Sequence, residues 1–318
     1  MKKFVLALII TGSALLVTGG ALVAVGYATG QSVKVETAEY KELGTFENFN
    51  INLRVADLEI KPSTDGTRSV IVDETKYDQH TVEVKDNTLV VTGHDKRQWF
   101  EHLFSWAFFQ KVKVTVYIPE GTYNTFKARN STGTVVVPAN YTFDSFDVKT
   151  STGSINSSAN SVNQIKAESS TGSINIKDVT AKSVSLKAST GSVHLTNAVV
   201  TEDVEAYAST GSVNLENVKC DNFKTDGSSG TVRLTNVIVD DKIDIKTSTG
   251  SVKLVDSDAN SLYIKTSTGS VNLTLLSEKV FYATSGTGSV SVPKSTTGGM
   301  CEIHSSTGSI KAVIKSAA

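Results

Sequence analysis

The sequence predicts an all-β protein, a single-stack parallel β-solenoid of about ten coils of 19–20 residues, preceded by an N-terminal transmembrane helix. The first observation is a tetrad, Ser-Thr-Gly-Ser or a close variant, that recurs ten times at spacings of 19 or 20 residues. The second is that apolar and polar residues alternate around each tetrad, as in short strands with one buried face. The central glycines, which we interpret as structural turn residues, are Gly133, Gly153, Gly172, Gly191, Gly211, Gly230, Gly250, Gly269, Gly288 and Gly308.

The N-terminal segment, residues 1–30, is the predicted membrane element. Residues 4–30 carry no charge, and roughly 20 apolar residues suffice to cross a bilayer core. Since a secretory signal core has only about 7–15 residues, we expect an uncleaved single-pass anchor in the cell membrane. Lys2 and Lys3 precede it, which favours a cytoplasmic N-terminus. The alternative is a signal segment that is cleaved to give a secreted protein. Both interpretations place residues 31–318 outside the cytoplasm.

Residues 31–125 lack the tetrad but contain strand-like stretches, and we expect a β cap or degenerate coils because a solenoid end must be covered. An aromatic insert interrupts this region at residues 94–110. Its spacing is that of an amphipathic helix, which is consistent with a cap, a membrane or partner contact, or a small-molecule pocket. The candidate partner or membrane contacts are Trp99, Phe100, Phe104, Trp106, Phe108 and Phe109.

Residues 126–318 hold the repeats, and each repeat is expected to contain two short strands with the glycine at the corner between them. A glycine at a sharp corner indicates a positive φ. Asn197, Asn217 and Asn236 lie six residues after their glycines and indicate a second corner. Parallel crossovers are nearly always right-handed, so we expect that hand. The last coil ends near Ile314 without an obvious cap, and we expect its open end to pair with another chain.

Ser and Thr are abundant, with 38 of each, and at least 29 of these 76 residues lie in three columns beside the corner glycine. One interpretation is structural: stacked hydroxyls bond each other and the corner backbone. The other is a regular hydroxyl surface that binds glycan, cell wall or another ordered surface. The two cysteines, Cys220 and Cys301, fall about four coils apart, so we expect no intramolecular disulfide.

Composition and side-chain placement argue against several functional classes. A net charge of −1 disfavours a nucleic-acid partner, and 39% hydrophobic residues argue against disorder. The column three residues after each glycine faces outward without a carboxylate: Val136, Asn156, Asn175, His194, Asn214, Arg233, Lys253, Asn272, Ser291 and Lys311. The five histidines form no ligand cluster in the sequence: His80, His94, His102, His194 and His304. We therefore expect no catalytic residues, no metal site and no cofactor.

Three features give the chain a resemblance to a known family. They are the repeated Ser-Thr-Gly-Ser followed by Val or Ile, the segment from Lys113 to Pro119, and the N-terminal apolar span. The chain resembles the bacterial putative-adhesin family of β-strand-repeat proteins, a domain of unknown function, over roughly residues 45–318. The resemblance implies a solenoid at the cell envelope, and some relatives are associated with envelope-stress signalling.

The expected function is that of a non-enzymatic extracytoplasmic envelope protein, an adhesin or a surface-binding scaffold whose partner is an envelope protein or a glycan. The alternative is a regulatory accessory of a membrane envelope-stress signalling system. A carbohydrate-active enzyme is the third hypothesis, and it is disfavoured because the outward columns do not pair acidic residues on adjacent coils.

Overall fold

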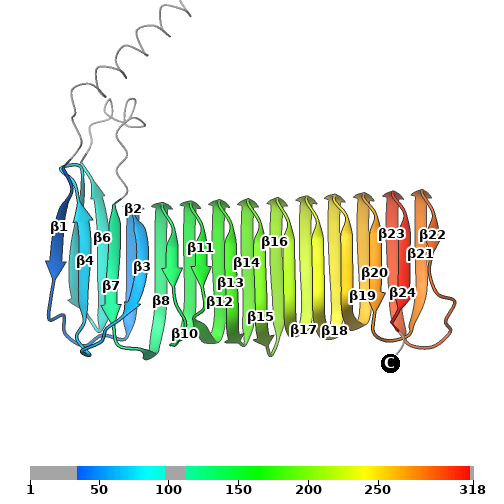
Figure 1. Ribbon diagram of the computed structural model, residues 1–318, viewed down its shortest axis with the longest axis horizontal. Helices are drawn as coiled ribbons and strands as arrows, with labels where there is room; N and C mark the ends of the chain where they lie inside the picture. Colours follow the sequence, from blue (N-terminus) through cyan, green and yellow to red (C-terminus); the bar gives the residue numbers. More distant parts are fainter. Residues whose placement is uncertain (1–33, 97–111, 316–318) are drawn as a thin grey trace, which may run out of the picture.

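The structure is a computed structural model that describes residues 34–96 and 112–315, and every regular element in these ranges is a β-strand. The strands wind into one elongated stack, an all-β solenoid of about ten turns (Figure 1). The strands before the repeats are β1 Glu36–Tyr40, β2 Asn48–Val55, β3 Asp57–Pro62, β4 Ser69–Glu74, β5 Asp78–Lys85, β6 Thr88–Asp95 and β7 Lys113–Ile118.

The repeats supply the remaining strands, in which a strand ahead of each corner glycine is followed by another strand after it. The first of them are β8 Gly121–Thr132, β9 Val135–Val137, β10 Tyr141–Thr152, β11 Ile155–Ser157, β12 Asn160–Thr171, β13 Ile174–Ala181, β14 Ser183–Thr190, β15 Val193–Val200 and β16 Asp203–Thr210. The others are β17 Val213–Ser229, β18 Val232–Thr249, β19 Val252–Thr268, β20 Val271–Leu275, β21 Lys279–Thr287, β22 Val290–Ser291, β23 Gly299–Thr307 and β24 Ile310–Ile314.

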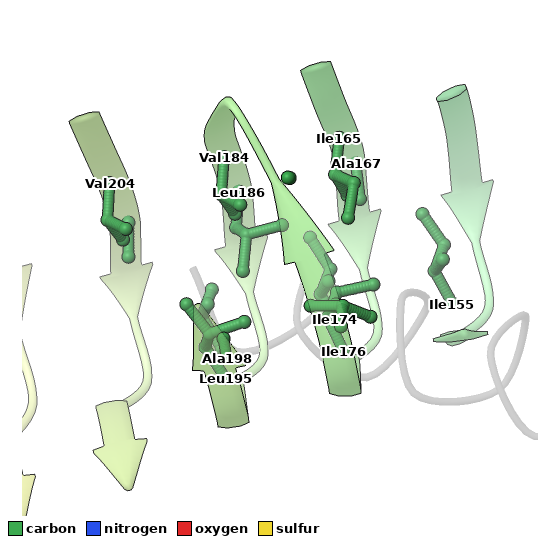
Figure 2. Packing of buried hydrophobic residues seen from close by; sticks show 14 of the residues in the cluster. Ile155, Ile165, Ala167, Ile174, Ile176, Val184, Leu186, Leu195, Ala198 and Val204 are labelled. Atoms are coloured by element: carbon green, nitrogen blue, oxygen red, sulfur yellow. The ribbon is translucent and has the colours of Figure 1, made fainter. Parts of the chain in front are cut away.

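Neighbouring coils pair in parallel with equivalent residues in register. Ile155 pairs with Ile174, and Ile174 pairs with Val193, so one apolar column continues from coil to coil. Figure 2 shows side chains from the strands before and after the corner meeting between two strand layers, for example those of the strand with Ile165 and Ala167 and of the strand with Ile174 and Ile176. These side chains are almost fully buried. Burying one such Val, Leu or Ile contributes about 1.5–3 kcal/mol, so each coil is stabilised mainly by its neighbours. The right-handed winding of the solenoid stays a prediction.

The N-terminal end is closed by antiparallel strands. Strands β2 and β3 form a coil without the tetrad, in which Ala56 takes the corner position next to Gly133. This coil lies between β8–β9 on one side and β6–β7 on the other. Beyond it, β4 pairs antiparallel with β7, β1 with β4, and β5 with β6. We call β1 and β4–β7 the N-terminal cap.

The C-terminal end has a coil order that differs from the sequence order. Strand β23 pairs with β19 on one side, where Cys301 meets Leu262, and with β21 on the other, where Cys301 meets Phe281. Strand β24 likewise lies between β20 and β22. The coil of Gly308, here called the inserted coil (β23–β24), is therefore placed between the coils of Gly269 and Gly288. The coil of Gly288, β21–β22, ends the stack and is called the terminal coil.

This coil order corrects the expectation about the open end of the stack. The prediction that the coil ending near Ile314 closes the stack is wrong, because β24 lies between β20 and β22 and the stack ends at β21 and β22. Only Ile310 and Lys311 of β24 pair with β22, whereas all of β24 pairs with β20. Cys301 lies in β23 and therefore belongs to the inserted coil, not to the end of the stack. Cys220 and Cys301 are both buried free thiols, and burial raises the pKa of each to about 12.

Several predicted features lie outside the described residues. They include the anchor at residues 1–30 and all six aromatic candidates of the insert, Trp99, Phe100, Phe104, Trp106, Phe108 and Phe109. Within residues 34–96 and 112–315, no helix has the length and apolar character needed to span a membrane.

Candidate functional site

The corner glycines form the tightest backbone contact of the stack. Nine of the ten, all except Gly250, have φ between 128° and 152°, a range that side chains rarely allow. A Cβ on Gly191 would lie only 2.6 Å from the carbonyl carbon of Gly172 in the neighbouring coil. The glycines therefore permit both the sharp corner and the close approach of successive corners.

A hydroxyl three residues before each of several glycines bonds to the adjacent corner. The Thr150 hydroxyl donates to the carbonyl oxygen of Gly133 at 3.4 Å, and the Ser169 hydroxyl donates to that of Gly153 at 3.0 Å. Equivalent bonds are made by Thr266, Ser285 and Ser305. This column was not among the features predicted from the sequence. Its signal was the recurrence of small hydroxyl residues at a position that alternation places in the core.

The hydroxyl directly after the glycine also serves the backbone in part of the stack. The backbone N–H of Ser192 donates to Ser173 Oγ at 3.3 Å, and the N–H of Ser212 donates to Ser192 Oγ at 3.2 Å. These bonds agree with the structural interpretation of the Ser and Thr columns.

The two columns directly before the glycine behave differently, because all of their side chains are exposed and, among the described residues, none of their hydroxyls bonds to another protein group. We call them the hydroxyl rows. One row is Ser131, Ser151, Ser170, Ser189, Ser209, Ser228, Ser248, Ser267 and Ser306; the other is Thr132, Thr152, Thr171, Thr190, Thr210, Ser229, Thr249, Thr268, Thr287 and Thr307. The rows run along the stack at the coil spacing of about 4.8 Å, with their hydrogen-bonding capacity directed to solvent.

A ladder of side-chain amides stabilises the second corner. Asn197, Asn217 and Asn236 have φ of 52–53°, and the amide N–H of each donates to the residue one coil earlier at 2.8–2.9 Å. The ladder starts at Asp178, which has φ 56°. Asn and Asp tolerate this left-handed conformation better than other side chains, so the predicted corner is present.

The outward face ahead of the corner carries charges that pair with each other. Lys149 lies 3.0 Å from Glu168, Lys242 lies 3.2 Å from Asp244, and Arg129 pairs with Asp147. The Lys149 ammonium, together with Lys166, holds the pKa of the Glu168 carboxyl below its ordinary value. Glu168 is therefore ionised at neutral pH and cannot act as a proton donor. In the described ranges, no three His, Cys, Asp or Glu side chains are arranged to hold a metal ion.

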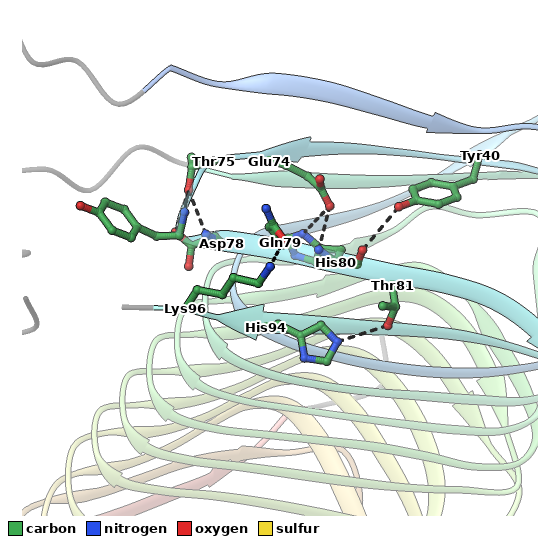
Figure 3. A network of polar contacts seen from close by, with 10 residues as sticks. Tyr40, Glu74, Thr75, Asp78, Gln79, His80, Thr81, His94 and Lys96 are labelled. Carbon is green, nitrogen blue, oxygen red and sulfur yellow. Dashed lines mark hydrogen bonds and ion pairs between the residues drawn. The ribbon is translucent and has the colours of Figure 1, made fainter. Parts of the chain in front are cut away.

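The N-terminal cap contains a polar network that Figure 3 shows. His80 is buried, its backbone N–H donates to Glu74 Oε1 at 2.7 Å, and its carbonyl accepts a bond from Tyr40 at 3.4 Å. The ring Nδ1 has no hydrogen-bond partner, and burial lowers the pKa of His80. His94 instead contacts the Thr81 hydroxyl at 3.3 Å. The cluster links β1, β4, β5 and β6 and is a packing feature of the cap.

Two open cavities lie at opposite ends of the rod. One, of about 430 Å³, is lined by Arg54, Arg129 and Lys149 where β2 and β6 diverge. The other, of about 470 Å³, is lined by Asp258, Lys279 and Gly299 beside the terminal coil. Lys279 and Asp258 form an ion pair there at 2.7 Å, and both of their side chains are largely buried. The pair neutralises itself, and the other charged side chains that line this cavity are the carboxylates of Asp240 and Glu278.

Comparison with known proteins gives a family and a set of similar folds. The family model Toastrack DUF4097 matches residues 46–207 and 200–318. No protein of curated function matches the sequence.

Solved structures similar to this chain cover 88% of it at low identity. A protein from Parabacteroides distasonis described as a putative lipid binding protein is 15% identical, matches over 97% of its own chain, and has a TM-score of 0.49. A putative adhesin from Bacteroides fragilis is also 15% identical, matches over 97% of its chain, and has a TM-score of 0.42. A putative adhesin from Parabacteroides merdae is 12% identical over 96% of its chain, with a TM-score of 0.29.

Proposed function

Because the chain belongs to the Toastrack DUF4097 family, whose model covers nearly all of the described solenoid, we propose that it is a non-enzymatic envelope protein that binds through its outer surface. The proposal places residues 31–318 outside the cytoplasm, held by the N-terminal segment, and its partner is an envelope polymer or protein. The observation that carries it is the pair of hydroxyl rows, which are exposed, in register and free of protein partners.

The hydroxyl rows suit a partner with repeated polar groups. Other hydroxyls at the corner bond to the backbone; the Ser169 hydroxyl, for example, donates to the Gly153 carbonyl oxygen. The exposed rows lie outside the core, and no described side-chain hydrogen bond accounts for their regularity. Hydroxyl groups both donate and accept hydrogen bonds, which matches the chemistry of a polysaccharide. A ladder spaced at about 4.8 Å presents many weak bonds at once, and such bonds bind through multivalency.

The test is binding of the full chain to isolated cell envelopes. A row variant carries Ser170→Lys, Ser189→Lys and Ser209→Lys. A matched control carries Val162→Lys, Thr180→Lys and Val199→Lys, which are exposed positions on the same coils outside the hydroxyl rows. We expect the row variant to lose at least about tenfold in envelope binding, while the control binds as the original chain does.

Three other results would contradict the proposal in different ways. Equal binding by both variants would remove the hydroxyl rows from the function. Release of soluble sugar from the envelopes would indicate a carbohydrate-active enzyme. Specific retention of a membrane sensor protein, unaffected by the row variant, would favour the regulatory alternative.

A further inference from the structure

The C-terminal end of the solenoid exposes residues that every other coil buries. Val290 is 42% exposed, whereas Ile310 and Val271, which occupy the same column in the next two coils, are 1% and 0% exposed. Phe281 is partly buried, although its column partner Cys301 is fully buried. The terminal coil therefore presents part of the apolar core to solvent.

The backbone at this end is also open. Strand β21 pairs only with β23, and β22 only with β24, so within the described residues each has one edge without a strand partner. Figure 1 shows these strands as the last of the stack, at the far end from the cap. An edge of unpaired N–H and C=O groups is a template for adding another strand.

The terminal coil is fixed in place rather than left to fray. Lys279 at the start of β21 pairs in register with Gly299 of the inserted coil. Its ammonium lies 2.7 Å from Asp258, which belongs to β19 on the far side of that coil. Gly299 has no side chain to obstruct this link. Strand β21 is thus fixed by contacts to both of the coils that precede it in the stack. A preorganised edge loses little conformational entropy when it binds a partner.

The charges on the edge strands distinguish two ways in which copies of the chain could pair. The terminal coil could pair with the terminal coil of a second copy, or with the N-terminal cap of a second copy. Residues 280–287 of β21 carry no ionised side chain, so two identical edges meet without repulsion. The edge strands of the N-terminal cap differ, since β1 contains Glu36 and Glu39 and β5 contains Glu83 and Lys85. Charged edge strands resist strand addition. Head-to-tail pairing would place the neutral edge of β21 against a charged edge strand of the N-terminal cap, which favours the tail-to-tail arrangement.

We propose that the terminal coil is a self-association surface, through which two copies of this chain pair tail to tail about a two-fold axis. A two-fold axis across the end of the stack sets β21 antiparallel to β21 of the second copy, and β22 antiparallel to its counterpart. The pairing completes the free backbone hydrogen bonds and covers Phe281 and Val290. It extends the core across the junction, much as each coil does for the next.

The contact is small and exchanges readily. Strand β21 has nine residues, which at about 3.3 Å each give an edge about 30 Å long and one coil wide. The surface that each copy buries at such an edge is smaller than the roughly 800 Å² per partner of a standard stable interface. The dimer is therefore weak in solution, with a Kd on the order of micromolar, and strong only where many copies are displayed together.

The experiment measures the mass of the full chain in mild detergent across a concentration series. The test variant carries Tyr282→Lys and Thr284→Lys, two exposed positions on β21 that bring like charges together across the two-fold axis. The control carries Val162→Lys and Val199→Lys in the middle of the rod. We expect the original chain and the control to dimerise and the test variant to show a Kd raised at least tenfold.

A charge swap separates loss of pairing from loss of folding. A second chain with Tyr282→Glu and Thr284→Glu also stays monomeric alone, and an equal mixture of the Lys and Glu chains restores the dimer. Crosslinking gives an independent measurement: Tyr282→Cys forms intermolecular disulfides readily, whereas Val199→Cys does not. A monomeric original chain at 100 μM overturns the proposal and leaves the edge to a strand of another protein. Dimers of the Lys variant alone also overturn it.

Discussion

At the scale of single residues, the corner glycine is the position where we expect a substitution to destabilise the fold most. Gly191 combines a φ of 135° with a Cβ position only 2.6 Å from the carbonyl carbon of Gly172. Gly191→Ala must therefore adopt an unfavourable backbone conformation and also separate two coils. We expect a loss of about 3 kcal/mol in the free energy of unfolding, measured by denaturant titration. Ser189→Ala, an exposed change in the same coil, serves as the control and leaves stability nearly unchanged.

The asparagine ladder combines two effects that a pair of substitutions separates. Asn217 has a φ of 53°, donates to Asn197 at 2.8 Å, and accepts from Asn236 at 2.9 Å. Asn217→Gly loses the hydrogen bonds but keeps the backbone relaxed, while Asn217→Ala loses both. We expect Ala to destabilise the chain by about 1 kcal/mol more than Gly, in thermal or denaturant unfolding. Equal effects of Gly and Ala would show that the corner does not depend on a left-handed conformation.

His80 makes the stability of the N-terminal cap depend on pH. Burial lowers its pKa, a change that the nearby Glu74 and Asp78 carboxylates oppose and His94 reinforces, so the folded ring stays neutral. As pH falls below the ordinary value of about 6.5, the unfolded chain takes up a proton that the folded chain does not. Stability therefore decreases from pH 7.5 to pH 5.5. His80→Gln should flatten this part of the profile in thermal unfolding, and an unchanged slope would assign the pH dependence to other groups.

At the scale of elements, the buried ion pair between β19 and β21 links the terminal coil to the coil beyond the inserted one. Lys279→Met leaves the Asp258 carboxylate largely buried without its cation, a kind of change that costs about 3–5 kcal/mol. We expect the terminal coil to open first. The thiol of Cys301 lies beneath this coil, and burial raises its pKa to about 12, so its alkylation reports the opening.

The cysteine at the centre of the rod gives the matching control for this prediction. Cys220 has the same raised pKa but lies in β17, several coils away from the terminal coil. Lys279→Met should speed alkylation of Cys301 by at least tenfold and leave Cys220 protected. The double variant Lys279→Met with Asp258→Leu should recover most of the protection. Equal acceleration at both thiols would mean that the whole stack, and not the terminal coil, has lost stability.

The tetrad period was enough to predict the elements but not their order at the ends. Alternation placed Ile174 and Val193 in one buried column, and the structure pairs them in register. The order of the last coils could not be derived, because every coil has the same corner and the same apolar columns. A strand such as β23 therefore fits equally well at either place. The exchanged order is visible only in the strand pairing, in which β23 lies between β19 and β21.

The roles of the hydroxyl residues were predicted only in part, for a similar reason. A stacked Ser or Thr has several acceptors within reach, and only the local direction of its side chain decides which it uses. Thr150 turns inward to the Gly133 carbonyl, while Thr152, two residues later, faces solvent. Sequence spacing gives the column but not this direction at a corner, where the strict alternation of a strand is interrupted.

At the scale of the whole molecule, the rod separates its two ends by the length of the stack. Roughly ten coils at about 4.8 Å give about 50 Å, with the cap at one end and the open terminal coil at the other (Figure 1). In a tail-to-tail dimer the two caps point in opposite directions. If the N-terminal segment anchors each chain, two copies then connect surfaces about 100 Å apart.

This geometry predicts homophilic clustering of cells that display the full chain. Many weak junctions act together between two surfaces, so clustering should occur even where the dimer in solution is weak. Cells that display the Tyr282→Lys, Thr284→Lys variant should stay dispersed, as should cells with the Glu pair, and a mixture of the two should cluster again. Settling rate or light microscopy measures the effect. If the Lys and Glu cells fail to cluster when mixed, although the purified chains pair in solution, the two anchors do not face opposite surfaces. The bridging role would then be wrong, while the dimer itself would stand.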